Sequence, residues 1–241
     1  GGERMENTVN NLGKRVKKYI DVLFARDISL TKYIYYNYFC KNIVRQGKNK
    51  IVPYKNSVLD LSKNARIYLS GTNNIVLGYN KLKNSKSETH VRLEGNAVWY
   101  CRNGADLFYN TVLEIKNGAV LDSGFFSANG GSVIIADKKI TFGEDVMIGR
   151  NVVIYDSDFH TLYNNEHKPA NPPKPVVIED HVWLTSNVTV LKGVTIGKDS
   201  LISAQTVINK NTPSHSIIGG NGVGHVIKDS VNWGRTRCPK E

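Results

Sequence analysis

The sequence predicts a mainly β protein: a parallel solenoid of six-residue repeats, with a basic helical segment before it and one long loop inside it. Two observations carry this prediction. Aliphatic residues recur every six positions in the C-terminal half, and the loop at 157–175 interrupts them without changing their phase. Three regions follow: an N-terminal segment over 1–50, the repeat domain over 51–220 and a C-terminal tail over 221–241.

The N-terminal segment is basic and has the pattern of amphipathic helices. Over 9–46, apolar and aromatic residues are spaced by three or four positions with lysines between them, and Gly47 is a stop signal. Residues 1–50 hold eleven Lys/Arg against four Asp/Glu, so they carry +7 of the net charge of +11. Such a segment can lie on an anionic membrane surface, or its apolar face can pack on its own domain or on a partner subunit. Residues 1–4, which precede Met5, are expected to be left over from expression.

The repeat begins loosely near residue 51, where short β-type pairs alternate with Asn and Gly, and becomes strict from residue 140. One track comprises Ile140, Val146, Val152, Val176, Val182, Val188, Val194, Ser200 and Thr206, and the other comprises Phe142, Ile148, Ile154, Ile178, Leu184, Val190, Ile196, Ile202 and Ile208. Each hexad supplies one short strand and one tight turn, and three such faces close a triangular coil. A hexapeptide period therefore predicts a parallel β-helix.

Composition excludes several classes. No apolar run approaches the roughly 18–20 residues that span a bilayer, and no secretory signal pattern is present. Cys40, Cys101 and Cys238 are odd in number and lack metal-site spacing, which predicts reduced thiols in the cytoplasm. The basic residues form no motif that reads RNA or DNA, so no nucleic-acid partner is expected. The predicted location is cytoplasmic, with a peripheral position at the inner membrane face as a further expectation.

Three stretches carry a family resemblance. Residues 140–154 (ITFGEDVMIGRNVVI) and 176–220 (from VVIEDHVWLTSN to HSIIGG) resemble the hexapeptide-repeat acyltransferases. The closing GHVIKDSVNWGR, residues 224–235, is similar to the ends of the branch that O-acetylates sialic acids and capsular or exopolysaccharide sugars. The resemblance covers about residues 130–235. It implies a left-handed β-helix, a homotrimer, acetyl-CoA as donor, no metal, and direct acetyl transfer to a sugar hydroxyl of a bacterial surface polysaccharide.

The loop at 157–175 is the expected site of chemistry, because a loop of this length inside a compact domain is usually functional or disordered. In the family that this chain resembles, the catalytic histidine opens such a loop, which makes His160 the candidate general base. A neutral imidazole suits removal of the hydroxyl proton during attack on the thioester. Asp156 or Asp158 is expected to orient the ring or stabilise the imidazolium, and Asp158 is the preferred candidate. His167, beside charged neighbours, is expected to be solvated.

The resemblance also implies residues that bind acceptor and donor. Substrate-binding candidates are Asn129, Tyr155 and His181. Cofactor-binding candidates are a tryptophan of the inter-subunit cleft, small residues of the coil turns and two lysines for the CoA phosphates, namely Trp183, Thr185, Ser203, Ala204, Lys192 and Lys210. Glycines expected from the family are replaced by Glu179, Thr185, Ser203 and Gln205. Because glycine permits close backbone approach to a ligand, these departures leave open a shifted pantetheine path or another acyl donor.

Three alternatives stay open from the sequence. The first is N-acetylation of an amino-sugar nucleotide, against which the C-terminal VNWGR favours O-acetylation. The second is a zinc hydratase with His160, His167 and His181 as ligands, which the lack of a close histidine pair disfavours. The third is a non-catalytic β-helix scaffold, which would have no need of a proline-rich loop that opens with a histidine.

Overall fold

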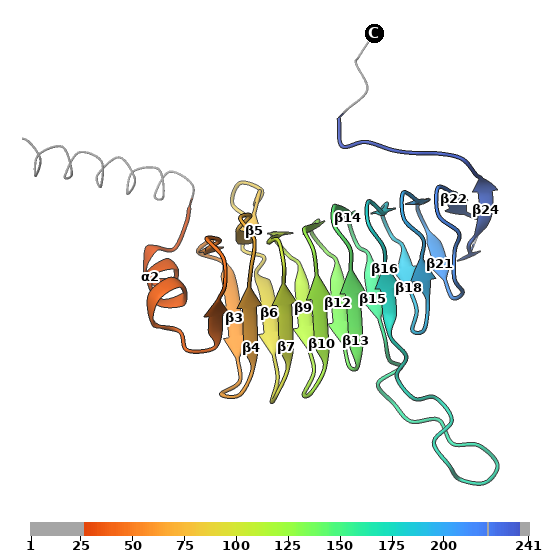
Figure 1. Ribbon diagram of the computed structural model, residues 1–241, viewed down its shortest axis with the longest axis horizontal. Coiled ribbons are helices and arrows are strands. Elements are labelled where there is room, and N and C mark those ends of the chain that lie inside the picture. Colours follow the sequence, from red (N-terminus) through yellow and green to blue (C-terminus); the bar gives the residue numbers. More distant parts are fainter. Residues whose placement is uncertain (1–26, 221, 237–241) are drawn as a thin grey trace, which may run out of the picture.

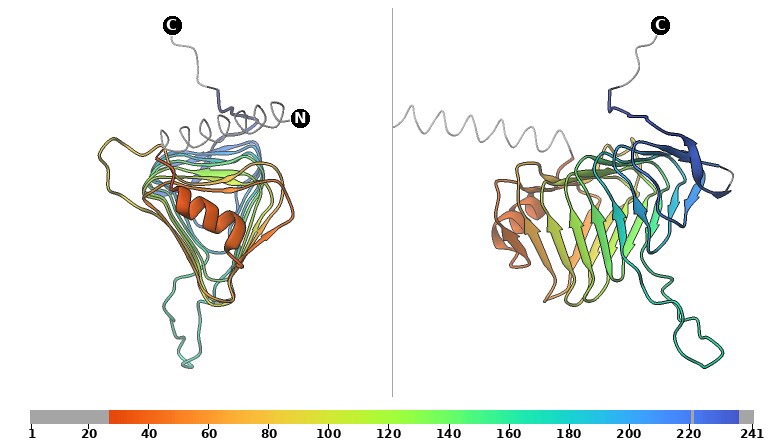
Figure 2. Two further views of the ribbon diagram at one scale, coloured as in Figure 1. Left: turned by 90° about the vertical axis from the view of Figure 1, so that its left-hand side faces the viewer. Right: turned by 45° about the vertical axis from the view of Figure 1, so that its right-hand side comes forward.

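A computed structural model describes residues 27–220 and 222–236 of this chain. Three-stranded coils stack along one axis and form a triangular prism (Figures 1 and 2). Neighbouring strands in each face come from successive coils and run parallel, except that the last strand of one face, at 225–228, pairs antiparallel with the strand at 217–219. The predicted fold class, a left-handed parallel β-helix, is confirmed.

The three faces of the prism are three sheets. The first sheet contains β1 (Ile43–Arg45), β4 (Arg66–Leu69), β7 (Val98–Cys101), β10 (Val120–Ser123), β13 (Lys139–Phe142), β16 (Val176–Ile178) and β19 (Thr195–Ile196). The second contains β2 (Ile51–Pro53), β5 (Ile75–Tyr79), β8 (Ala105–Phe108), β11 (Phe126–Ala128), β14 (Val146–Ile148), β17 (Trp183–Leu184), β20 (Leu201–Ile202), β22 (Ile217–Gly219) and β24 (His225–Lys228). The third contains β3 (Ser57–Leu61), β6 (Thr89–Leu93), β9 (Val112–Ile115), β12 (Val133–Ala136), β15 (Val153–Tyr155), β18 (Thr189–Val190), β21 (Thr206–Ile208) and β23 (Gly222–Val223).

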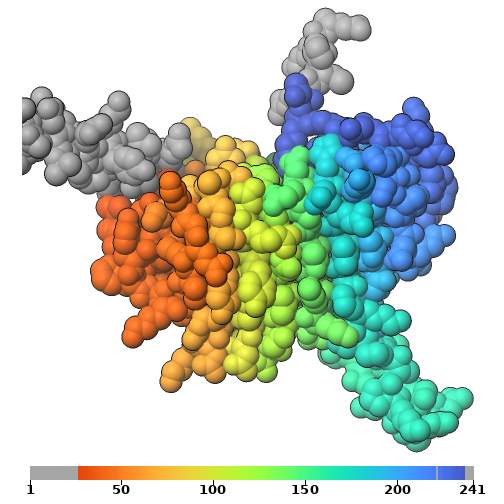
Figure 3. Space-filling model, viewed as in Figure 1, coloured from red at the N-terminus to blue at the C-terminus, as the bar shows by residue number. Residues whose placement is uncertain are grey.

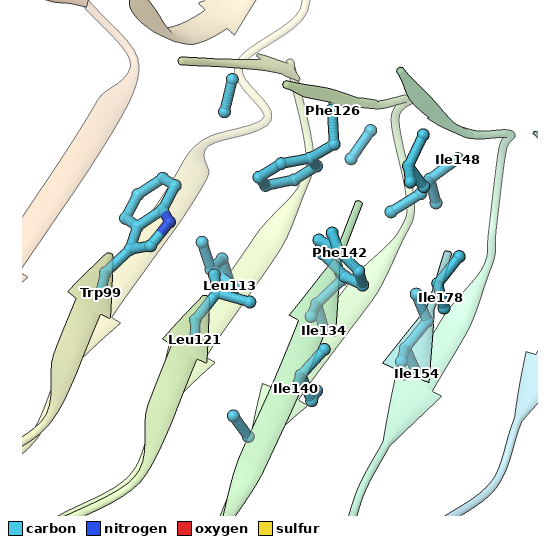
Figure 4. Packing of buried hydrophobic residues seen from close by; sticks show 14 of the residues in the cluster. Trp99, Leu113, Leu121, Phe126, Ile134, Ile140, Phe142, Ile148, Ile154 and Ile178 are labelled. Atoms are coloured by element: carbon cyan, nitrogen blue, oxygen red, sulfur yellow. The ribbon is translucent and has the colours of Figure 1, made fainter. Parts of the chain in front are cut away.

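The two sequence tracks fill the interior of the prism. Every residue of both tracks is buried, including the polar Ser200 and Thr206. Side chains alternate in direction along a strand, so one residue of each adjacent pair points inward and the other points to solvent. In the middle coils, Trp99, Phe126 and Phe142 follow one another in tilted and edge-on contacts, with centroid separations of 6.3 Å and 4.9 Å (Figure 4). Full burial of each such side chain contributes on the order of 2–3 kcal/mol.

The coils before residue 130 are less regular than those of the strict region, as the looser repeat predicts. Strand register pairs Ile43 with Ile67 and Arg66 with Val98, coils of 24 and 32 residues. In the strict region, Ile178 pairs with Ile196, a coil of 18 residues.

The loop at 157–175 is an insertion that the register tolerates. Ile140 pairs with Val176, 36 residues later and twice the length of a strict coil, and Phe142 pairs with Ile178 in the same register. The prediction that the tracks stay in phase across the loop is therefore confirmed. The loop stands clear of the prism (Figures 1 and 3).

The N-terminal end of the prism is closed by the helix α2 (Leu30–Ile34) and the π-helical turn η1 (Tyr35–Phe39). Helix over all of 9–46 is wrong for the last residues, because β1 begins at Ile43 and pairs with β4. Residues 9–26 lie outside the described part of the chain, and the proposed boundary at residue 50 stays a prediction. None of the helices in the described residues is long and apolar enough to cross a membrane.

The corners of the prism are named here for the sheets that they join. Edge I joins the first sheet to the second and carries His181 and Asp199; edge II joins the second to the third and carries Asn129, Thr185, Ser203 and Ala204; edge III joins the third to the first and carries the loop at 157–175, Lys192 and Lys210. After β24 the tail runs back over the second sheet (Figure 2).

Candidate functional site

His160 lies at the base of the loop on edge III, where a tight turn presents it to solvent. Its backbone N–H donates to the carbonyl of Asp158 at 2.7 Å, so Phe159 is the centre of a three-residue turn. Phe159 has φ of 58°, a left-handed conformation that is costly for an aromatic residue. Its backbone N–H bonds the Ser157 hydroxyl, and its ring packs edge-on against Tyr155 with centroids 5.3 Å apart. These contacts hold the strained turn in place.

A pocket of about 280 Å³ opens beside His160. Its walls come from the loop base and from edge III, and include Ser157, Phe159, His160, Asn171, Pro172 and Pro173. Prolines restrict the backbone, so this wall costs little entropy to order. Among the described residues no side chain bonds the imidazole of His160, which leaves both ring nitrogens available to a ligand in the pocket.

Asp156 is a structural residue of the loop stem. Its carboxylate is buried and accepts hydrogen bonds from the backbone N–H groups of Asp137, Lys138 and Lys139, at 2.6–2.8 Å. Burial raises the pKa of Asp156 above the ordinary carboxyl value, and the three donors oppose this rise. A role for Asp156 in orienting His160 stays a prediction that this geometry does not support, because its oxygens are bonded to the preceding coil.

Asp158 anchors the loop to the next coil. Its carboxylate accepts from Lys192 Nζ at 2.5 Å and from the Asn171 side chain at 2.8 Å. The hydrogen bonds from Lys192 and Asn171 hold the pKa of Asp158 below its ordinary value. No bond joins this carboxylate to the His160 ring within the described residues, so the orienting role stays a prediction that this geometry does not support. Lys192 also donates to the Asn171 carbonyl at 2.9 Å, so two of the three donors of the ammonium group that is predicted to meet CoA phosphate are used within the chain.

Edge II carries the other candidates on an unbroken row of short turns. Asn129 donates its side-chain amide to Ile148 O at 3.0 Å, and Thr185 donates its hydroxyl to Ile202 O at 2.8 Å, so both tie one coil to the next. A Cβ atom at Gly149 would lie 2.6 Å from Thr185 O, which shows how closely these turns approach. Ser203 is half-buried and Ala204 is exposed on the same edge.

His181 and Trp183 lie beneath the C-terminal tail. The His181 ring stacks on Trp233 with centroids 4.1 Å apart and an interplanar angle of 7°, and His181 Nδ1 lies 2.9 Å from Asp199 Oδ1. Trp233 also donates its indole N–H to His181 O at 2.8 Å and packs against Trp183 at 5.6 Å. Arg235 then pairs with Asp145 at 2.5 Å. The tail thus covers one face of both predicted residues in the same chain.

One chain therefore brings together only part of the predicted site. His160, Tyr155, Asp158 and Lys192 meet at edge III, and Lys210 is an exposed residue of the same edge. Asn129, Thr185, Ser203 and Ala204 lie on edge II, and His181 and Trp183 lie toward edge I. Sequence reasoning missed Asn171 and the Phe159 turn. The signal for Asn171 was its position beside the Pro172–Pro173 pair, at the point where the loop returns to the coil.

Other chemistry has little support among the described groups. Burial raises the pKa of the Cys101 thiol to about 12, so it is not a thiolate nucleophile at neutral pH. Cys40 is also buried, and Cys238 lies outside the described residues. No group of three or more His, Cys, Asp or Glu side chains in the described residues is arranged to hold a metal ion.

Comparison with known proteins agrees with this architecture. Residues 175–210 match the family model for the bacterial transferase hexapeptide repeat. The chain is 29% identical to a polysialic acid O-acetyltransferase of Neisseria meningitidis, over 79% of this chain and 88% of that protein. The resemblance to hexapeptide-repeat acyltransferases is confirmed. The chain is also 36% identical to a galactoside O-acetyltransferase of Lactococcus lactis, over 44% of this chain and 50% of that protein.

The coverage of other relatives is shorter, and solved structures share the fold. A polysialic acid O-acetyltransferase of Escherichia coli O1:K1 is 28% identical, over 52% of this chain, and the match spans only 41% of that protein. The crystal structure of the polysialic acid O-acetyltransferase OatWY superposes with a TM-score of 0.56 at 25% identity, over 81% of this chain and 92% of that one. The polysialic-acid-specific acetyltransferase NeuO gives 0.51 at 22% identity, over 84% and 93%.

Proposed function

We propose that this protein is an O-acetyltransferase that moves an acetyl group from acetyl-CoA to a sugar hydroxyl of a bacterial surface polysaccharide. The observation that carries the proposal is the free imidazole of His160 at a pocket wall, at the base of an insertion in a hexapeptide-repeat prism. Relatives named for O-acetylation of polysialic acid and galactosides support a sugar hydroxyl over an amine.

The chemistry follows from the atoms that this arrangement presents. The acceptor hydroxyl donates to a neutral ring nitrogen of His160, which takes its proton as the oxygen bonds to the thioester carbonyl carbon. Collapse of the tetrahedral intermediate breaks the carbon–sulfur bond, and the imidazolium returns the proton to the departing CoA thiolate. No covalent enzyme intermediate is needed, which agrees with the buried thiol of Cys101.

The assembled enzyme in this proposal is a homotrimer. Edge III supplies His160 and the exposed ammonium of Lys210, whereas edge II supplies the small Ser203 and Ala204 against which pantetheine would lie. A neighbouring copy with its edge II beside edge III of the first chain completes a site that neither chain has alone.

The test is a pair of histidine variants in the same loop. His160→Ala should lower kcat for acetyl transfer to sialic acid or galactoside acceptors by about 10²–10⁴-fold, the usual contribution of a general base. His167→Ala, an exposed histidine at the loop tip, is the matched control and should retain activity. Turnover by His160→Ala within a few-fold of wild type would refute the assignment.

We further propose a peripheral position at the cytoplasmic membrane face through the end of the prism. Tyr38 and Phe39 of η1 are 66% and 68% exposed, and Lys50 lies over the Tyr38 ring at 5.3 Å. Exposed aromatic rings beside lysines suit the interface of an anionic bilayer. Tyr38→Ser with Phe39→Ser should reduce co-flotation with phosphatidylserine vesicles; unchanged flotation would contradict the proposal.

A further inference from the structure

A second pocket, of about 270 Å³, lies on the outer face of the first sheet near its N-terminal end. Tyr68 of β4 and Tyr100 of β7 occupy the same register position on adjacent strands, and their rings stack with centroids 5.1 Å apart and an interplanar angle of 19°. Tyr100 is 44% exposed. The next strand, β10, places Asp122 opposite Tyr100, so the aromatic pair ends at a carboxylate.

The polar groups of this pocket offer hydrogen bonds without a net charge. Arg102 forms an ion pair with Asp122 and also donates to Phe142 O at 3.2 Å. Gln46 and Ser70 complete the wall with an amide and a hydroxyl. Since the guanidinium is neutralised, a phosphate or other free anion gains no unpaired cation here, whereas hydroxyl groups find both donors and acceptors.

An aromatic face beside paired polar groups matches the two surfaces of a pyranose ring. The C–H groups of such a ring carry partial positive charge and pack on the negative face of an aromatic ring, while its hydroxyls bond amides, carboxylates and guanidinium groups. We propose that the pocket of Tyr68, Tyr100, Arg102, Asp122, Gln46 and Ser70 binds a sugar unit of a glycan, at a position separate from the His160 pocket.

The position of the pocket relative to the loop with His160 indicates that this glycan is the acceptor. The loop with His160 feeds directly into β16, and β7, β10, β13 and β16 are successive strands of one sheet. At about 4.8 Å per strand, β7 and β16 are roughly 14 Å apart along the axis. The pocket also lies at the opposite corner of this sheet from His160, because Gln46, Ser70 and Arg102 follow the ends of their strands at edge I, whereas the loop precedes β16 at edge III. A polymeric acceptor that lies across the first sheet can occupy both pockets at once. The inference rests on the proposed function in this one respect: the bound glycan is the acceptor chain, held several sugar units from the hydroxyl that reacts.

Direct binding tests the pocket independently of catalysis. Galacto-oligosaccharides of one to six units, which are uncharged like the pocket, are titrated into the full-length protein without acyl donor, by saturation-transfer NMR and calorimetry. Tyr100→Ala should weaken binding of the six-unit ligand about tenfold, and Tyr100→Phe, which keeps the ring, should not. Gln46→Ala should weaken it about threefold. Binding should change little between 50 and 500 mM salt, because the site is neutral.

A matched control separates the pocket from a general effect of losing an exposed tyrosine. Tyr79, 43% exposed on the second sheet, is replaced by alanine, and this variant should bind like wild type. In turnover, Tyr100→Ala should raise KM for the six-unit acceptor and leave KM for the single sugar and kcat unchanged. Equal binding by wild type and Tyr100→Ala, or an equal loss of binding in Tyr79→Ala, would overturn the proposal. His160→Ala should bind the six-unit glycan like wild type in the same titrations. Glycan binding at this pocket is thereby tested separately from the proposed catalytic role of His160.

Discussion

Edge II and edge III run along the same prism, but the chain uses them differently in the C-terminal coils. Edge II keeps short turns whose hydrogen bonds, such as Thr185 to Ile202 O, tie each coil to the next. Edge III is opened by an 18-residue insertion whose stem is tied down by charged groups, among them Asp156 and Lys192. The comparison indicates that an insertion at one corner builds the pocket beside His160, whereas the regular turns of edge II only join successive coils. It also places the candidate base and the candidate donor-binding residues at different corners of one chain.

The largest effect on the stability of edge III is expected from its buried carboxylate. Asp156→Ala leaves three backbone N–H groups without their acceptor, which should cost about 2 kcal/mol of unfolding free energy, a factor of about 30 in the folding equilibrium. The melting temperature should then fall by about 4–8 °C. Calorimetry checks this, with Asp137→Ala, whose side chain does not accept these bonds, as control. An unchanged melting temperature would show that the stem does not depend on these bonds.

A smaller effect, confined to activity, is expected from the lysine that anchors the loop. Lys192→Met removes the bonds to Asp158 and Asn171 and should lower kcat about tenfold, because small displacements of a catalytic group are costly. Steady-state kinetics with varied acetyl-CoA measure this. Lys210→Met, an exposed lysine of the same edge, is the matched control and should change KM for acetyl-CoA by only about threefold with kcat unchanged. A purely KM effect in Lys192→Met would instead support its predicted contact with CoA phosphate.

The smallest effect is expected in the pH dependence of the contact between Asp158, Lys192 and Asn171. The pKa of Asp158 is lowered in the folded protein, so the stabilisation by its bonds to Lys192 and Asn171 is fully present above the ordinary carboxyl pKa of about 4. It is lost as pH falls through the lower folded value. The protection of the Asn171 and His160 amides, measured as their exchange rate relative to that of an unstructured peptide at the same pH, should therefore be constant from pH 8 to 5 and decrease only below about pH 4. A loss of protection already at pH 6 would contradict the role of this carboxylate, and Asp158→Asn should abolish the response.

The sequence predicted the interior of this molecule better than its surface. A six-residue period requires inward positions to stack, so both tracks from Ile140 to Ile208 are buried, and the loop was found because it left their phase intact. Contacts between distant turns have no such period. Repeat spacing does not determine the directions of side chains at the corners of the prism. It could therefore not predict that Asp156 bonds the preceding coil or that Asp158 bonds Lys192 rather than His160. The contact of Trp233 with His181 is a third example.

At the N-terminal end of the prism, the sequence pattern predicted the wrong secondary structure for one segment. Apolar spacing predicted helix through residue 46, but Ile43–Arg45 instead pairs with Ile67–Leu69 as the first strand of the prism. Local helical periodicity was overridden by the exposed edge of a sheet, which gains hydrogen bonds from any extended segment that can reach it.

In the proposed assembly the site is divided between two chains, and subunit complementation is a direct test of this division. His160→Ala removes the base on edge III, and Ala204→Trp fills the small-residue position on edge II, so each protein alone should be inactive. Refolded together in equal amounts, they should recover about a quarter of wild-type activity, because one of four random pairings of neighbouring edges is intact. A mixture of Ala204→Gly with His160→Ala is the control, because glycine changes the same position without adding a large side chain. Recovery near a quarter supports a shared site; no recovery in mixtures shown to exchange subunits would contradict it.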